Sequence, residues 1–241
     1  MRVGAVTDRG QLRPNNQDGY RIMGRLVAVA DGMGGHQAGE VASFTALETL
    51  VSCPLDGDDP GASLLAAVQE ANRRVYTLSL SRPDYAGMGT TLTAALFARN
   101  RWWIAHVGDS RAYLFRQGRL RQVTRDHSVV AELVALGHLR AEEARNHPQR
   151  HLLTRALGLD ASVDVDLYSV EAYPEDRLLL CTDGLSGVLP DATIREVLAS
   201  QGSPDEQASR LAGKALEEGA PDNVTVVVVS LDAADLREGD P

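Results

Sequence analysis

Short apolar runs that meet an aspartate recur along the chain. The runs at residues 27–31, 102–109 and 177–183 each end on an aspartate, and the run Val224–Ser230 begins two residues after Asp222. Apolar runs of this length, bounded by turn residues, predict buried strands. If the last strand lies antiparallel to the others, the four aspartates lie together at one end of the sheets.

A helical period is clearest at residues 63–81, where apolar side chains recur at three- and four-residue spacing. A second helix is expected to start with Ser203 as its N-cap, Pro204 at the first helical position and Glu206 at the third. Further helices are expected at residues 41–51, 129–136, 141–146 and 191–199, and further strands at residues 2–7, 20–23, 92–97, 112–115, 120–123 and 163–170. This irregular order favours packed antiparallel sheets flanked by helices over a doubly wound sheet.

Composition indicates an ordinary globular domain. The chain has 241 residues, of which 44% are hydrophobic, and its net charge is −9. The negative charge argues against a general binder of nucleic acid or of membrane surfaces, but it does not exclude phosphate substrates, because bound cations invert the local field. We expect one domain at residues 1–231 and an acidic, loose tail at residues 232–241.

The cysteines, the lengths of the apolar runs and the single lysine limit the possible cellular compartments and reaction types. Cys53 and Cys181 are too few for a disulfide framework, and no apolar run reaches the length of a membrane span, so a cytoplasmic protein is expected. Neither cysteine has an arginine six residues later, which excludes a cysteine-based phosphatase. Lys214 is followed by alanine and lacks the upstream glycine of a Walker nucleotide loop.

Four carboxylates gathered at one place would repel one another, so a cation is expected among them. Oxygen ligands without a cysteine or histidine cluster favour Mg²⁺ or Mn²⁺ over zinc, and more than two carboxylates suggest at least two ions, about 3.5–4 Å apart. Each aspartate alone has a structural alternative. Asp31 and Asp183 stand in Asp-Gly pairs that are common in turns, Asp109 could pair with Arg111, and Asp222 could belong to a helix-exit loop.

Residues 125–153 interrupt the β pattern and contain a cluster of histidines. Their spacings match no structural zinc site. We interpret the segment as a mobile flap over the site, and a solvated surface insertion is the alternative.

Short motifs follow one another in a fixed order along nearly the whole chain, from about residue 2 to 231. They are Arg13-Pro-Asn-Asn-Gln-Asp18, Asp31-Gly-Met-Gly-Gly-His36, Gly89-Thr-Thr91, Gly108-Asp-Ser-Arg111, Asp126-His-Ser128, Leu153-Thr-Arg-Ala-Leu-Gly158, Thr182-Asp-Gly184 and Asp222-Asn223. This ordered set resembles the metal-dependent Ser/Thr protein phosphatases of type 2C (PPM), in their short bacterial form. The resemblance implies an α+β fold, a four-layer α-β-β-α sandwich of two mainly antiparallel sheets flanked by helices, with a flap.

The resemblance also implies a set of metal ligands. Asp31 would bridge two ions, and the Gly32 carbonyl would help to hold the second. Asp183 and Asp222 would complete the first site, and Asp109 together with Asp183 would hold a third, weaker ion.

Roles for the remaining site residues follow from the same resemblance. Asp18 would order metal-bound water, Arg13 would bind the substrate phosphate, and His36 would protonate the leaving oxygen. The alternatives are a surface ion pair for Arg13 and a turn-stabilising role for His36. Gln17 stands where many members have glutamate, which removes a charge beside the second metal site. The flap, at about residues 126–151, would influence substrate choice.

The expected function is Mg²⁺- or Mn²⁺-dependent hydrolysis of phosphoserine and phosphothreonine in proteins by a metal-bridging hydroxide. Its partners would be a bacterial serine/threonine kinase and that kinase's targets, and a monomer is expected. One alternative is a catalytically weak regulator that binds phosphoproteins, which only Gln17 favours. Another is a phosphatase of stress-response regulators, but that branch lacks a histidine at position 36.

Overall fold

The computed structural model describes residues 1–35, 38–145 and 147–237. The strands are β1 (Arg2–Asp8), β2 (Asp18–Met23), β3 (Leu26–Met33), β4 (Gly89–Thr90), β5 (Leu92–Ala98), β6 (Arg101–Val107), β7 (Arg111–Arg116), β8 (Arg119–Gln122), β9 (Asp166–Glu171), β10 (Arg177–Cys181) and β11 (Val224–Ser230). The helices are α1 (Ala38–Ser52), α2 (Pro60–Ser81), the 3-10 helix η1 (Pro83–Tyr85), α3 (Val129–Ala135), α4 (Ala141–Ala144), α5 (Asp183–Ser186), α6 (Asp191–Ala199), α7 (Pro204–Glu217) and α8 (Ala233–Arg237).

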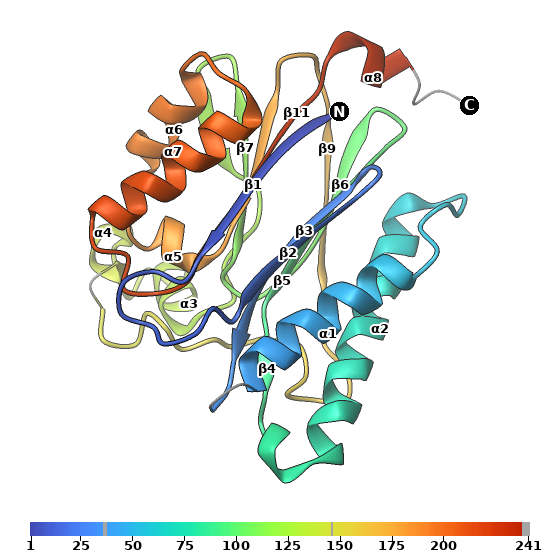
Figure 1. Ribbon diagram of the computed structural model, residues 1–241, viewed down its shortest axis with the longest axis vertical. Helices are drawn as coiled ribbons and strands as arrows, with labels where there is room; N and C mark the ends of the chain where they lie inside the picture. The colour runs from blue at the N-terminus through green and yellow to red at the C-terminus, as the bar shows by residue number, and fades with distance from the viewer. Residues whose placement is uncertain (36–37, 146, 238–241) are drawn as a thin grey trace.

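Two antiparallel sheets face each other in the middle of the molecule (Figure 1). One sheet has the strand order β1-β11-β10-β7-β8, and the other has the order β2-β3-β5-β6-β9 with β4 paired to β3. Helices α1 and α2 cover the outer face of the second sheet, while α6 and α7 cover the outer face of the first. The expected four-layer α-β-β-α sandwich is therefore confirmed.

The central strands are apolar throughout because both of their faces are buried. In β3, Val27 and Val29 pack between the sheets, whereas the alternate residues Ala28 and Ala30 pack under α1 and α2. Strand β11 follows the same alternation, with its even-numbered valines under the helices and its odd-numbered valines between the sheets. Side chains of period two that are buried on both faces produce the continuous apolar runs of the sequence.

Most elements lie where the sequence predicts them. Helix α7 has Ser203 as its N-cap, and the Ser203 hydroxyl accepts the Glu206 N–H while the Glu206 carboxylate accepts the Ser203 N–H. Strand β11 and helix α6 have the expected bounds.

Four expectations about individual segments differ from the structure. The 163–170 strand begins only at Asp166, because its partner β6 ends at Val107, one residue past the pair His106–Asp166. A short helix, α5, replaces the turn expected at Asp183, and α8 replaces part of the loose tail. Of the helix expected at residues 141–146, α4 forms the first turn and Asn146 lies outside the described residues.

The flap connects the two sheets beside the ends of β8 and β9. Its stems are joined by a β-bridge between Ser128 and Leu153, and the Ser128 hydroxyl caps α3 by accepting the Ala131 N–H. Within the flap, directly after α4, Arg145 donates to the carbonyls of Ser186 and Leu189 beside the cavity described below. No helix within residues 1–35, 38–145 and 147–237 is long and apolar enough to cross a membrane.

Candidate functional site

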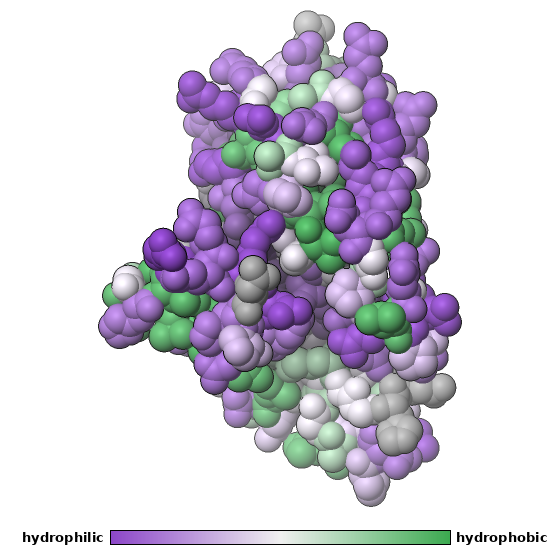
Figure 2. All heavy atoms as spheres, turned by 90° about the vertical axis from the view of Figure 1, so that its left-hand side faces the viewer, coloured by the Kyte–Doolittle hydropathy of each residue, from purple (hydrophilic) through white to green (hydrophobic). Residues whose placement is uncertain are grey.

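A cavity of about 870 Å³ opens where the strand ends, the flap and the loop at residues 9–17 meet. Figure 2 shows the face that contains the flap, which is mainly hydrophilic and carries its apolar side chains in separate patches. The residues that line the cavity and that the sequence predicts for the site are Arg13, Asp31, Gly32, Asp109, Asp183 and Asp222. Asp18 does not line this cavity but a separate one of about 370 Å³ beside α1. His36 lies outside the described residues, so its predicted role stays a prediction.

Strand pairing brings the predicted carboxylates together. Strands β10 and β11 are antiparallel, so Asp183, just after β10, and Asp222, just before β11, lie at the same end of their sheet. In the other sheet, Asp18 of β2 pairs directly with Asp31 of β3. Asp31 does not stand in a turn as expected, because β3 continues past it to pair with β4. The predicted gathering of aspartates at one end of the sheets is therefore what the backbone produces.

Asp31 is fixed through its backbone, which leaves its carboxylate available. Its N–H donates to the Thr91 hydroxyl at 2.9 Å, and its carbonyl accepts the Thr91 N–H at 2.9 Å. The Thr90 hydroxyl donates to the same carbonyl at 2.9 Å. Burial, and then the neighbouring carboxylate of Asp18, raise the pKa of Asp31 well above its ordinary value.

Gly32 follows Asp31 at a point of close backbone approach. A Cβ atom on Gly32 would lie 2.0 Å from the carbonyl oxygen of Gly39 at the start of α1, so no larger residue fits there. The Gly32 N–H donates to the Gln17 carbonyl at 3.2 Å. These contacts draw the motif around Gln17, β3 and α1 together beside the cavity.

Asp18 is held from one side only. Its Oδ2 accepts the Thr182 hydroxyl at 2.7 Å, while its buried Oδ1 has no hydrogen-bond partner among the described residues. Burial raises the pKa of Asp18 to about 7, although the hydrogen bond from Thr182 acts in the opposite direction. A carboxylate in this state is poorly stabilised as an anion unless a cation or an ordered water supplies what Oδ1 lacks.

Arg13 and Asp222 form an ion pair at the mouth of the cavity, with 2.6 Å between Nη2 and Oδ2. The bond to Asp222 is the main cause that raises the pKa of Arg13. More than half of the Arg13 side chain is exposed, so such a pair contributes little to stability. Arg13 thus forms the surface ion pair that was the alternative to phosphate binding, but its partner, Asp222, is itself a predicted site residue.

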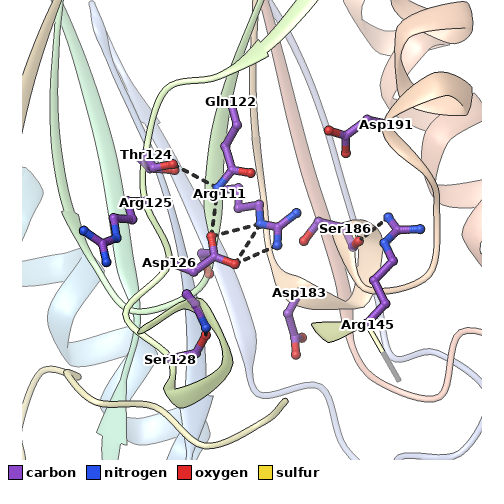
Figure 3. Close-up of polar contacts among 12 residues, drawn as sticks. Arg111, Gln122, Thr124, Arg125, Asp126, Ser128, Arg145, Asp183, Ser186 and Asp191 are labelled. Carbon is purple, nitrogen blue, oxygen red and sulfur yellow. Dashed lines mark hydrogen bonds and ion pairs between the residues drawn. The ribbon is translucent and has the colours of Figure 1, made fainter. Parts of the chain in front are cut away.

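Asp109 occupies the turn between β6 and β7 and forms no ion pair with another of the described residues. Figure 3 shows that Arg111 instead binds Asp126 at the base of the flap, through Nε at 2.9 Å and 3.0 Å and through Nη2 at 2.7 Å. The proposed alternative, a pair between Asp109 and Arg111, is therefore wrong. Burial, followed by the charge of Asp183, raises the pKa of Asp109 well above its ordinary value.

The donor set fits Mg²⁺ or Mn²⁺, although the carboxylates do not close on a common point by themselves. No group of three His, Cys, Asp or Glu side chains among the described residues is arranged so that it could hold a metal ion. These ions keep several waters and often take only one or two carboxylates each, so a three-ligand cage is not required. One buried oxygen each of Asp18 and Asp183 lacks a hydrogen-bond partner among the residues that the structure describes, and a hydrated cation nearby would supply one.

Sequence reasoning quoted Thr182 and Asn223 within motifs but gave them no role. The Thr182 hydroxyl supports Asp18 and also accepts the Thr225 N–H at 3.0 Å. The Asn223 side chain donates to the carbonyls of Arg9 and Asn15 and accepts the Gln17 N–H at 2.8 Å. Their position directly beside a predicted ligand was the available signal, but the contacts with Asp18, Arg9, Asn15 and Gln17 each span more than 160 residues of sequence.

A four-layer sandwich with a carboxylate-lined cavity at its strand ends is the arrangement that the sequence motifs predict for a metal-dependent phosphatase of type 2C. The chain belongs to the protein phosphatase 2C family, whose sequence pattern matches residues 6–133. A structural neighbour, the crystal structure of the catalytic domain of the serine/threonine protein phosphatase PstP in complex with two manganese ions, has a TM-score of 0.89 and is 46% identical, over 96% of this chain and 98% of that chain.

Two curated relatives set the scale of the similarity. The serine/threonine protein phosphatase PstP of Mycobacterium tuberculosis is 47% identical over 245 residues, which cover 100% of this chain but only 47% of that protein. The chain thus spans about half the length of this relative. The serine/threonine phosphatase stp of Listeria monocytogenes is 41% identical over 237 residues, which cover 94% of each chain.

Proposed function

We propose that the chain is a metal-dependent protein phosphatase that hydrolyses phosphoserine and phosphothreonine in proteins. The observation that carries the proposal is one cavity lined by Asp31, Asp109, Asp183 and Asp222 with Arg13 at its mouth. Carboxylates supply hard ligands for divalent cations, and the planar guanidinium suits a phosphate. The names of the relatives support the same activity.

The ligand assignment is part of this proposal. Asp31, the Gly32 carbonyl, Asp183 and Asp222 would hold two Mn²⁺ or Mg²⁺ ions, and Asp109 with Asp183 would hold a third. Bound ions of this kind polarise a phosphoryl oxygen and lower the pKa of a coordinated water towards neutrality. Their charge also counteracts the repulsion and burial that raise the pKa values of Asp31 and Asp109.

The chain's own residues bind and orient the reactants. Arg13 must leave Asp222 in order to bind the substrate phosphate, and its exposed side chain has the freedom to do so. Asp18, held by Thr182, presents its unpartnered Oδ1 as an acceptor that can orient water. His36 stays our prediction for the group that donates a proton to the leaving oxygen.

The expected substrates are phosphoproteins of a bacterial serine/threonine kinase, and the kinase itself is an expected partner. This pairing, a monomeric state and a cytoplasmic location stay predictions.

The test is hydrolysis of a phosphothreonine peptide with Mn²⁺, Mg²⁺, Ca²⁺ or a chelator, by the parent chain and by Asp183→Ala. The matched control is Asp191→Ala, which removes the same charge from a wall of the same cavity where the Tyr113 hydroxyl contacts the carboxylate. We expect turnover that requires Mn²⁺ or Mg²⁺, is lost in Asp183→Ala and persists in the control. Turnover in the presence of the chelator would contradict the proposal.

A phosphoprotein-binding regulator of the same fold is the second candidate, and Gln17 is the observation that favours it. The backbone of Gln17 is nevertheless firmly placed, since its carbonyl accepts the Ser43 hydroxyl at 2.6 Å. Tight binding of the phosphopeptide without turnover in Mn²⁺, together with activity gained in Gln17→Glu, would support the regulator.

A further inference from the structure

His127, at the start of the flap, forms two hydrogen bonds with Gly108, the residue that precedes Asp109. Its ring is buried, and Nδ1 accepts the Gly108 N–H at 3.1 Å. The backbone N–H of His127 donates to the Gly108 carbonyl at 2.8 Å. Gly108 has a φ of +111°, a conformation that glycine adopts without strain. Both polar groups of this glycine are therefore held by one histidine.

These contacts determine which ring nitrogen of His127 carries the proton. Because Nδ1 accepts a hydrogen bond from a backbone N–H, it carries no proton, and the ring proton resides on Nε2. Nε2 lies 3.2 Å from Oδ2 of Asp166 in β9, off the line of an ideal hydrogen bond. The carboxylate thus faces the nitrogen that must be protonated.

Asp166 also binds the other stem of the flap. Arg155, just beyond the flap, donates from Nη1 to Asp166 Oδ1 at 2.8 Å, and the Tyr168 hydroxyl donates to Oδ2 at 3.0 Å. The stems are joined directly as well, since the Thr154 N–H donates to the His127 carbonyl at 2.9 Å. Burial alone would raise the pKa of Asp166, but the hydrogen bond from Arg155 and the nearby ring of His127 outweigh it and lower the pKa to about 2.

We propose that Asp166 is a positioning residue that fixes the tautomer of His127, through which the Gly108–Asp109 turn is held at the base of the flap. The opposite tautomer would place a ring N–H against the Gly108 N–H and remove the hydrogen bond between Gly108 and Nδ1. The inference rests on the proposed function, because there Asp109 is a ligand of the third ion. A carboxylate that orients a histidine acts in the same way behind metal sites, and its loss typically costs about 10–100-fold in metal affinity.

Two substitutions of His127 separate the two contacts of its ring. His127→Asn keeps an acceptor near the position of Nδ1 but is too short to reach Asp166. His127→Gln keeps a donor near the position of Nε2 but has no acceptor for the Gly108 N–H. We expect the Gly108 amide to exchange its hydrogen faster in His127→Gln than in His127→Asn, and the weakest Mn²⁺ site, identified by its loss in Asp109→Ala, to weaken about tenfold more in His127→Gln.

The carboxylate is tested by nitrogen NMR of the His127 ring in Asp166→Asn. The oxygen of the amide stays with the charged Arg155, so its NH₂ group faces Nε2 of His127 and opposes a proton there. The control is Asp176→Asn, because Asp176 is a buried carboxylate bound by Arg116 at 2.8 Å and 2.7 Å and lies far along β10 from the cavity. We expect a changed tautomer population in Asp166→Asn and none in the control.

Each outcome decides the proposal. A parent ring with its proton on Nδ1, equal exchange of the Gly108 amide in the two His127 variants, or an unchanged tautomer population in Asp166→Asn would overturn it. Exchange and ring spectra are measured without metal or substrate. If they behave as expected while the parent hydrolyses no phosphopeptide, the proposed function fails and the positioning role stands.

Discussion

Thr182→Val is the substitution for which the structure gives the sharpest expectation. Thr182 is fully buried between β10 and α5. Its hydroxyl donates to Asp18 Oδ2 at 2.7 Å and accepts the Thr225 N–H at 3.0 Å. Valine has nearly the same shape, so the change removes both hydrogen bonds and leaves the packing in place. Oδ2 of Asp18 then loses the Thr182 hydroxyl, while Oδ1 already lacks a partner among the described residues.

The expected loss follows from these two bonds. A buried backbone N–H left without a partner costs about 1–3 kcal/mol, and a hydrogen bond to a charged group contributes about 1.5–3 kcal/mol. Together they predict a loss of about 2.5–6 kcal/mol for Thr182→Val when Asp18 is ionised. Thr182→Ser keeps both bonds and loses one buried methyl group, which costs about 1 kcal/mol.

The assay is urea unfolding of the metal-free protein at pH 8, above the pKa of about 7 that burial gives Asp18. At an unchanged slope, the unfolding midpoint of Thr182→Val should lie well below that of Thr182→Ser. Mn²⁺ binding should weaken in the valine variant as well, because an unsupported Asp18 no longer keeps its place behind Asp31. Equal midpoints for the two variants would refute the reasoning, since valine retains more apolar surface than serine.

Other predictions concern pH, the flap and the turn at α5. Between about pH 4 and 7 the folded metal-free chain keeps a proton on Asp18 that the unfolded chain has lost. The free energy of unfolding, measured in urea, should therefore fall with rising pH by up to about 1.4 kcal/mol per pH unit. Added Mn²⁺ should restore the lost stability. Arg145→Ala removes the bond to the Ser186 carbonyl and should speed proteolysis of the flap, whereas an unchanged cleavage rate would count against that contact. Gly184→Ala places a Cβ 1.9 Å from the Asn223 carbonyl oxygen and should lower the unfolding midpoint and Mn²⁺ affinity together.

The sequence was sufficient for the elements whose signals are local. The apolar run of β11 and the capping box of α7 are complete within a few residues, so their bounds could be predicted. Helix α5 could not be predicted, because Gly184 within it and Gly187 directly after it indicate a turn, and its stability comes from the burial of Leu185 against distant elements. The start of β9 was likewise set by where β6 ends.

The hydrogen-bond partners of each carboxylate could not be predicted either, because they too come from distant parts of the chain. Nothing local indicates that Arg111 turns away from Asp109, two positions before it, to bind Asp126 on the flap. The role of Thr182 depends on Asp18, which is 164 residues away. A sequence pattern can place an acidic side chain at a strand end, but the donors that reach it are decided by the packing of both sheets.

Those donors separate structural carboxylates from candidate ligands within one cavity. Asp126 receives three contacts from Arg111 and a further one from Gln122, so its oxygens are occupied and its charge is compensated. Asp31 and Asp109 accept no hydrogen bond from another side chain among the described residues, although burial raises the pKa of both. Leaving such groups unpaired destabilises the folded chain unless a cation binds. The same acidic residue type therefore has two roles in this cavity, and the position of Arg111 determines that Asp126 is structural while Asp109 stays available.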